Sequence, residues 1–239
     1  MKIKEFELDL PYVENKMYVK ELLKSGIEHD EATRIDYQKN WLQKRRDFQL
    51  KTRCITSMIA RIMKPIVNDQ YWKILIQCRT DYIESSEAVV RNLNGVLSLS
   101  AYFDLHTFYG MCNYQKKMYI VDFILKTMET ISPLLDIDIS NVVEACYYVI
   151  DRRYNNLWTF HQKLNKEKDL LAKVLVEHDV DTVNIVIEIT DDSSLIKRIC
   201  LYQTLPDERA YAKLLGKIQW KNNRTLLFIS KQDKRIIHL

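Results

Sequence analysis

The stretch that most constrains the fold is residues 30–67, which holds no glycine and no proline before Pro65. Its largest apolar side chains recur every seven residues, at Trp41, Phe48, Ile55 and Ile62. Two helical turns cover about seven residues, so these side chains share one face. The pattern predicts a helix over residues 32–64, about 50 Å long at ~1.5 Å per residue. Pro65 ends it because proline lacks a backbone donor and disfavours helix in the preceding residue.

The same stretch is strongly basic, with a single acid, Asp47, between residues 39 and 64. The bases are Lys39, Lys44, Arg45, Arg46, Lys51, Arg53, Arg61 and Lys64. Such a helix can bind nucleic acid by neutralising phosphates, with Tyr37 and Trp41 stacking on bases. The bases recur at most helical angles, however, and charged outer faces are common on amphipathic helices. We therefore favour a solvated face and keep nucleic-acid binding by residues 39–64 as an alternative.

The bulk composition indicates a protein with a substantial core. The chain has 239 residues, of which 47% are hydrophobic, and a net charge of +4. The first ten residues lack the apolar core of a signal peptide, and no run approaches the ~18 apolar residues of a membrane span. The five cysteines are widely spaced, which is typical of reduced thiols. We therefore expect a cytoplasmic protein that does not enter a membrane.

Alternation predicts strands on either side of this helix. Residues 2–10 alternate as an opening strand, and residues 12–24 follow as a short helix that ends near Gly26. Asn94 and Gly95 tolerate the positive φ angles of a tight hairpin turn. We predict three antiparallel strands here, at about residues 71–79, 87–93 and 96–103.

Helical spacing returns in the middle of the chain, and alternation returns at its end. The predicted helices cover residues 105–132, 141–164 and 167–177, the second opening on an Asn141–Glu144 capping box. Five strands then form a β-meander. The fold class is α+β, with an antiparallel sheet packed against several long helices. We expect a single domain, residues 1–239, with a subdivision into 1–103 and 104–239 as the alternative.

One segment is acidic and holds no lysine or arginine. It includes Glu177, Asp179, Asp181, Glu188, Asp191 and Asp192. Clustered oxygen ligands suit hard cations, but the spacing is not that of an EF-hand, and the Glu-x-Lys pattern of two-metal nucleases fails. We therefore predict no metal and no cofactor. An electrostatic use is favoured, either against the basic helix or against a basic partner.

Tyrosines form a further candidate surface near residues 147–158. Tyr147, Tyr154 and Trp158 lie there on the predicted helix, with arginines between them. Tyrosine, tryptophan and arginine are favoured in protein interfaces. A helix packed on two sides explains the same residues. We prefer that second explanation and keep the first open.

No catalytic motif survives inspection, since the histidines are scattered and the four glycines form no phosphate loop. The sequence favours a non-catalytic protein that binds another protein, such as an inhibitor or an immunity-type antidote. The alternatives are a nucleic-acid-binding protein, and a hydrolase or nuclease whose site converges only in the fold. The candidate protein-binding residues are Asp179, Asp181, Asp191, Asp192, Lys44, Arg45, Lys51, Tyr147, Tyr154 and Trp158.

Overall fold

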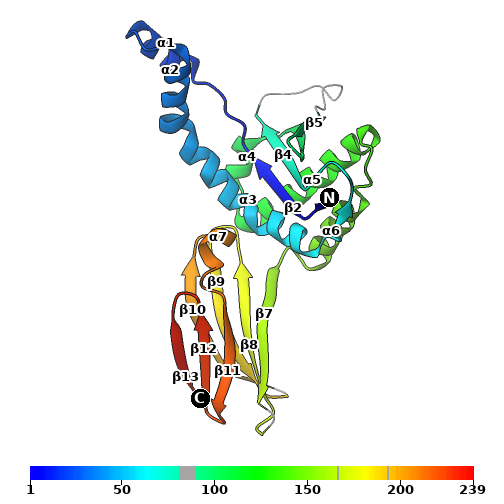
Figure 1. Ribbon diagram of the computed structural model, residues 1–239, viewed down its shortest axis with the longest axis vertical. Helices are drawn as coiled ribbons and strands as arrows, with labels where there is room; N and C mark the ends of the chain where they lie inside the picture. Colours follow the sequence, from blue (N-terminus) through cyan, green and yellow to red (C-terminus); the bar gives the residue numbers. More distant parts are fainter. Residues whose placement is uncertain (81–89, 166, 193) are drawn as a thin grey trace. The chain divides into compact units, whose positions relative to one another are not determined.

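The computed structural model describes residues 1–239 apart from 81–89, 166 and 193 (Figure 1). It has the predicted α+β fold. The chain divides into two compact units, Met1–Tyr154 and Asn155–Leu239. That boundary lies about fifty residues after the one we drew between residues 103 and 104. The single-domain organisation stays a prediction.

Unit 1 is built on a four-stranded sheet with the strand order β2-β4-β6-β5. The strands are β2 (Glu5–Asp9), β4 (Lys73–Arg79), β5 (Val90–Leu93) and β6 (Val96–Tyr102). The prediction of three antiparallel strands is wrong for β4, because β2, β4 and β6 are all parallel to one another. The hairpin places its second strand, β6, between β4 and β5, so consecutive strands β4 and β5 are not neighbours.

The predicted hairpin itself is confirmed, since β5 and β6 pair antiparallel around Asn94 and Gly95. Their φ angles are +53° and +84°, the left-handed values that such a turn requires. A Cβ atom at Gly95 would also lie 2.9 Å from the Trp72 ring. Residues 87–89 of the predicted strand lie outside the described residues.

The long basic helix is present, but a π-helical segment interrupts it. Its parts are α2 (His29–Asp36), the π-helical Tyr37–Trp41 and α3 (Leu42–Ile62). The predicted stripe is largely confirmed, because Trp41, Phe48 and Ile55 are buried. Before it, α1 (Lys16–Lys24) ends at Gly26, whose φ is +85°. Only Val19 of α1 is buried, whereas its apolar residues Met17 and Leu23 are exposed.

The predicted helix over residues 105–132 is divided in two. The helices are α4 (Leu105–Gly110) and α5 (Asn113–Ile131), and a 3₁₀ turn follows at Ser132–Leu134. Between them Met111 and Cys112 are extended. Two short strands, β1 (Lys2–Ile3) and β3 (Ile66–Val67), form a separate ribbon.

The next helix, α6 (Ser140–Asp151), is shorter than predicted. The Asn141–Glu144 capping box is wrong: instead, Asp138 accepts a hydrogen bond from the backbone N–H of Ser140 at 2.8 Å. The helix ends because Arg153 and Tyr154 adopt positive φ angles of 52° and 58°. The prediction of helix to residue 164 is therefore wrong.

Unit 2 consists of two antiparallel sheets and a short helix. The first sheet has the order β10-β9-β8-β7, from β7 (Asn156–Asn165), β8 (Leu170–His178), β9 (Val183–Thr190) and β10 (Leu195–Thr204). The second is the predicted C-terminal meander, β11 (Gly216–Asn222), β12 (Thr225–Ser230) and β13 (Lys234–His238), preceded by α7 (Glu208–Tyr211). Since β8 is a strand, the helix predicted over residues 167–177 is also wrong.

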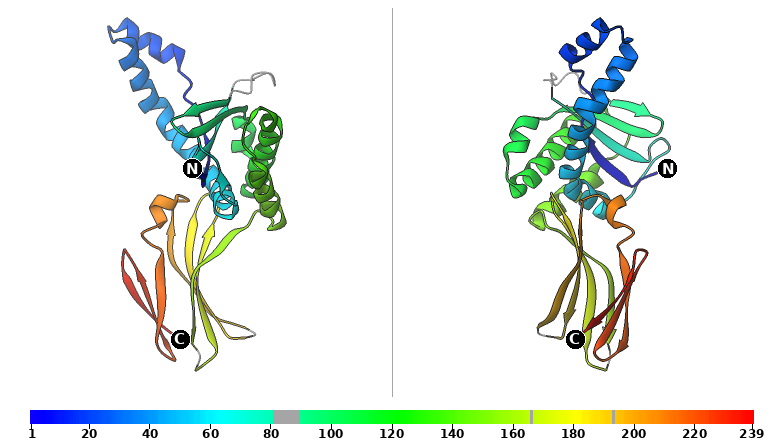
Figure 2. Two further views of the ribbon diagram at one scale, coloured as in Figure 1. Left: turned by 45° about the vertical axis from the view of Figure 1, so that its right-hand side comes forward. Right: turned by 90° about the vertical axis from the view of Figure 1, so that its left-hand side faces the viewer.

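The two sheets of unit 2 face each other, as Figure 2 shows, and enclose one apolar core. Polar contacts join their edges on both sides. On one side, the backbone N–H of Ile218 donates to His161 Nδ1 at 3.3 Å, and Trp220 Nε1 donates to the Lys163 carbonyl at 3.1 Å. On the other side, Arg235 Nη1 donates to the Leu201 carbonyl at 2.8 Å.

The first of these contacts predicts a pH-dependent stability. Burial lowers the pKa of His161 below its ordinary value of 6.5, and Lys217 and Lys163 lower it further. The folded state thus favours the neutral ring, whose Nδ1 lone pair accepts the Ile218 N–H. The stabilisation is fully present above the pKa that His161 has in the unfolded state. It is lost as the pH falls through the pKa that His161 has in the folded state.

Urea denaturation between pH 7.5 and 5 will measure this effect. His161→Asn keeps an acceptor near the Nδ1 position and does not titrate, so we expect it to reduce the loss of stability at low pH. Identical pH dependence in both proteins would show that His161 is not responsible.

Candidate functional site

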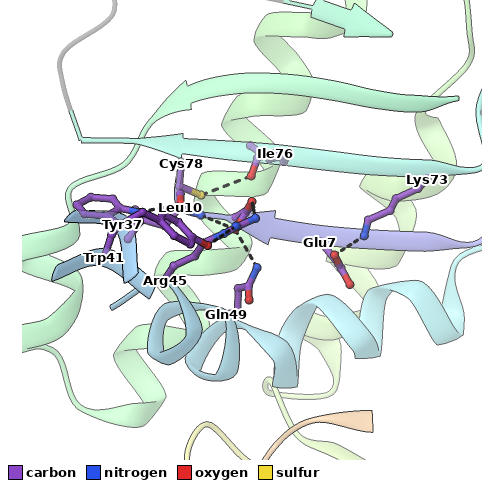
Figure 3. A network of polar contacts seen from close by, with 10 residues as sticks. Glu7, Leu10, Tyr37, Trp41, Arg45, Gln49, Lys73, Ile76 and Cys78 are labelled. Carbon is purple, nitrogen blue, oxygen red and sulfur yellow. Dashed lines mark hydrogen bonds and ion pairs between the residues drawn. The ribbon is translucent and has the colours of Figure 1, made fainter. Parts of the chain in front are cut away.

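A network of charged and polar side chains lies between β2 and α3 (Figure 3). At its centre is the buried carboxylate of Asp9. Its Oδ1 accepts hydrogen bonds from Leu10 N at 2.9 Å, Arg45 Nε at 2.7 Å and Gln49 Nε2 at 2.8 Å. Its Oδ2 accepts from Arg45 Nη2 at 2.5 Å. The carboxylate is thus held on both oxygens by groups of the chain itself.

Arg45 is engaged by this network on both sides of its guanidinium. Its Nη1 donates to Tyr37 Oη at 3.0 Å, and the side chain is 36% exposed. The hydrogen bonds to Asp9 raise the pKa of Arg45, although burial acts in the opposite direction. Arg45 therefore has a structural role, because its contacts link α3 to the end of β2.

A second acid of β2, Glu7, is held in a similar way by Arg53, about two helical turns after Arg45 on α3. Arg53 Nη1 donates to Glu7 Oε1 at 2.5 Å, and Lys73 Nζ donates to Oε2. Burial alone would raise the pKa of Glu7, but the hydrogen bonds from Lys73 and Arg53 outweigh it, so the pKa is lowered. Arg45 and Arg53, two of the bases of the long helix, therefore contact carboxylates of β2.

Other bases of the helix also have acidic partners. Lys51 lies 3.8 Å from Asp47, and Lys64 lies 3.3 Å from Glu144. Lys44 is exposed, with its Nζ 4.6 Å from the centre of the Trp41 ring. The excess of bases in the sequence is thus partly neutralised by acids of β2 and α6 and by Asp47 of α3 itself.

A separate hub, Asp36, fixes the start of α1 against α2. Its carboxylate accepts from Tyr12 Oη at 2.5 Å, Asn15 N at 2.9 Å and Asn40 Nδ2 at 2.7 Å. Burial would raise the pKa of Asp36, and these donors lower it below its usual value. These hydrogen bonds therefore fix the start of α1 relative to the end of α2.

The acidic segment of unit 2 is used mainly inside its own sheet. Arg198 of β10 pairs with Glu188 on the adjacent strand β9 and with Glu177 on β8, the next strand of the sheet. Asp191 accepts from Ser194 N at 2.7 Å, and Asp179 accepts from Val180 N at 2.8 Å, so both shape turns. Asp181 and Asp192 are exposed. Within the described residues, no group of three or more acid, histidine or cysteine side chains is arranged to hold a metal ion.

The structure does not bring the tyrosine-rich residues onto one helix. Tyr147 is 54% exposed on α6, whereas Tyr154 is 8% exposed after the helix, with its ring 5.6 Å from that of Tyr114. Trp158 lies on β7, packed against the core of unit 2. The neighbour of Tyr147, Tyr148, is 42% exposed and was not among our candidates.

Sequence reasoning also missed the outer face of α1, which we call the lysine face. It consists of Lys16, Met17, Lys20, Leu23 and Lys24, all exposed. The spacing of the lysines at every fourth residue was the available signal, because residues four apart share a helical face.

The structure also contains a groove that the sequence did not indicate. Its volume is about 690 Å³, and we call it the acidic groove. It is lined by residues from 65–71, 134–138, Val90 and Asn141. Asp69, Asp136 and Asp138 lie in this lining, while none of the described lining residues is lysine, arginine or histidine. Asn68 holds one wall, since its amide donates to Tyr71 O at 2.9 Å and accepts from Gln70 N at 2.8 Å.

None of the helices among the described residues has the length and apolar character needed to cross a membrane. No protein-family model, curated protein or solved structure matches the chain.

Proposed function

We propose that the protein acts by binding another protein through a tyrosine face, formed by Tyr147 and Tyr148 on α6 and by Arg152, the residue that follows the helix. The observation that carries the proposal is the exposure of both rings, 54% and 42%, on a helix whose opposite side is buried. The guanidinium of Arg152 lies 5.1 Å from the centre of the Tyr148 ring.

The buried side of α6 makes these tyrosines outward-facing. Val142, Cys146 and Val149 have no exposed surface and anchor the helix in unit 1. Large amphipathic rings on a fixed helix bury much area on association and lose little conformational freedom. Tyrosine and arginine are also the residues that most often dominate binding energy in protein interfaces.

A cytoplasmic inhibitor or immunity-type antidote is one role that such a surface serves, and we retain it as part of this proposal. The charged candidates have less support. Arg45 and Lys51 already have acidic partners, and Asp179 and Asp191 shape turns. Nucleic-acid binding by α3 is less supported for the same reason, since Arg45 and Arg53 contact carboxylates of β2.

Affinity capture from the native cell tests the proposal. The wild-type protein should recover one specific protein at near-stoichiometric yield, and Tyr147→Ser with Tyr148→Ser should reduce that yield at least about tenfold, as expected for loss of more than ~1.4 kcal/mol. The melting temperature should change little, because both side chains are exposed.

The matched control is Tyr102→Ser, which removes a tyrosine that is 44% exposed on β6. Equal loss of capture in the control would show that the effect is not specific to the tyrosine face on α6. Undiminished capture by the double variant would place the interface elsewhere.

A further inference from the structure

Two surfaces of unit 1 carry opposite charge and lie at opposite ends of the long helix. The lysine face of α1 is at its beginning, where Lys39 Nζ lies 4.9 Å from the centre of the Tyr18 ring. The acidic groove begins at Pro65, shortly after the helix ends at Ile62. From His29 to Ile62 the helix extends about 50 Å, at ~1.5 Å per residue.

The lysine face has charge and apolar surface together. Its three lysines form no ion pair with any residue that the structure describes. They are spaced at about 6 Å along the helix axis, so they span about 12 Å. Met17 is 78% exposed and Leu23 is 40% exposed beside them.

The acidic groove has the complementary composition. Asp69 and Asp136 are exposed and make no hydrogen bond or ion pair to another described residue, whereas Asp138 accepts a hydrogen bond from the backbone N–H of Ser140. Val67 and Leu134, which line the same groove, are 74% and 60% exposed. The three carboxylates do not converge as metal ligands do. They suit an extended cationic surface with apolar side chains between its charges.

We propose that the occupant of the acidic groove is the lysine face of a second copy of this chain. The charge match of the two surfaces, and the exposed apolar side chains on both, support this choice. Two copies related by a twofold axis, with their long helices antiparallel, make the contact twice, because a residue pair in such a dimer is repeated by symmetry. This dimer goes beyond the proposed function and uses a different surface from the tyrosine face.

Sedimentation equilibrium of the full chain tests the proposal. We expect the mass of a dimer at low salt and a shift toward monomer at high salt, because screening weakens contacts between exposed charges. Lys16→Glu, Lys20→Glu and Lys24→Glu together should weaken self-association at least about 100-fold, since facing like charges are strongly unfavourable. Asp69→Lys with Asp136→Lys should do the same.

Mixing the two variants gives the decisive result. In the mixed pair, glutamates on α1 meet lysines in the groove at one contact, and the wild-type surfaces meet at the other. A heterodimer should therefore form although each variant alone is monomeric. The matched control is Lys4→Glu, Lys126→Glu and Lys168→Glu, three exposed lysines elsewhere, which should leave the dimer intact.

Circular dichroism first checks that each variant is folded. Its self-association is then compared with that of the wild-type protein. A wild-type protein that is monomeric at low salt overturns the proposal, as does a dimer that survives both reversals. A mixture of folded variants that fails to associate also overturns it. Loss of partner capture in the tyrosine variants leaves the dimer unaffected, so the two proposals fail separately.

Discussion

Replacing Asp9 by alanine is expected to lower the free energy of unfolding by about 3 kcal/mol, at the low end of the range for breaking a buried ion pair. The low end applies because Arg45 is 36% exposed, although the Asp9 side chain is only 11% exposed. The substitution leaves the Arg45 guanidinium without its carboxylate and removes the acceptor of Leu10 N and Gln49 Nε2. Urea denaturation measures the loss, and amide hydrogen exchange in β2 and α3 assigns it to unit 1.

Two comparisons separate the ion pair from a general effect of charge. Glu5→Ala removes a neighbouring acid that is 56% exposed and should change stability by less than about 0.5 kcal/mol. Adding Arg45→Met to Asp9→Ala should recover part of the loss, because the unpaired cation is then removed as well. A loss no larger than that of Glu5→Ala would mean that the network contributes little.

Features that depend on local chain chemistry were predicted correctly. The Asn94–Gly95 hairpin follows from two residues that tolerate positive φ, and the long helix follows from its heptad stripe. The end of α1 near Gly26 is of the same kind. Each of these depends on neighbours in sequence.

Features that depend on partners distant in sequence were missed. The parallel pairing of β4 with β6 is set by the insertion of β6 into the sheet, which no local pattern encodes. Residues 156–164 were assigned to the helix that begins at Asn141, yet Leu157 and Leu164 are about half exposed on β7. A shift in strand register between Thr159 and His161 further disturbs the alternation that would have marked a strand.

The candidate sites show the same limit. The count of bases in α3 was correct, but the sequence does not show that Glu7 and Asp9, more than thirty residues earlier, accept from Arg53 and Arg45. Only pairing across the fold distinguishes a structural arginine from one that is free to bind a partner. Tyr147 was recognised by its residue type, whereas its exposure depends on which side of α6 is buried in unit 1.

Replacing Phe123 by alanine is expected to lower the free energy of unfolding by about 3–5 kcal/mol, the usual cost of truncating a buried phenylalanine. Phe123 lies on α5 and is 8% exposed. Its ring packs edge-on against that of Phe103, with the centroids 4.9 Å apart. Phe103 in turn contacts the rings of Phe48 and Phe108, so one truncation leaves a cavity beside an aromatic cluster from several elements.

Urea denaturation measures this loss, and hydrogen exchange in α5 and β6 localises it to unit 1. Leu42→Ala is the control, since Leu42 is 47% exposed on α3 and should change stability by no more than about 0.5 kcal/mol. Phe123→Leu is expected to lower the free energy of unfolding less than Phe123→Ala, because it removes less volume from the core. A loss below about 1 kcal/mol for Phe123→Ala would place the ring outside the core, because surface truncations rarely cost more.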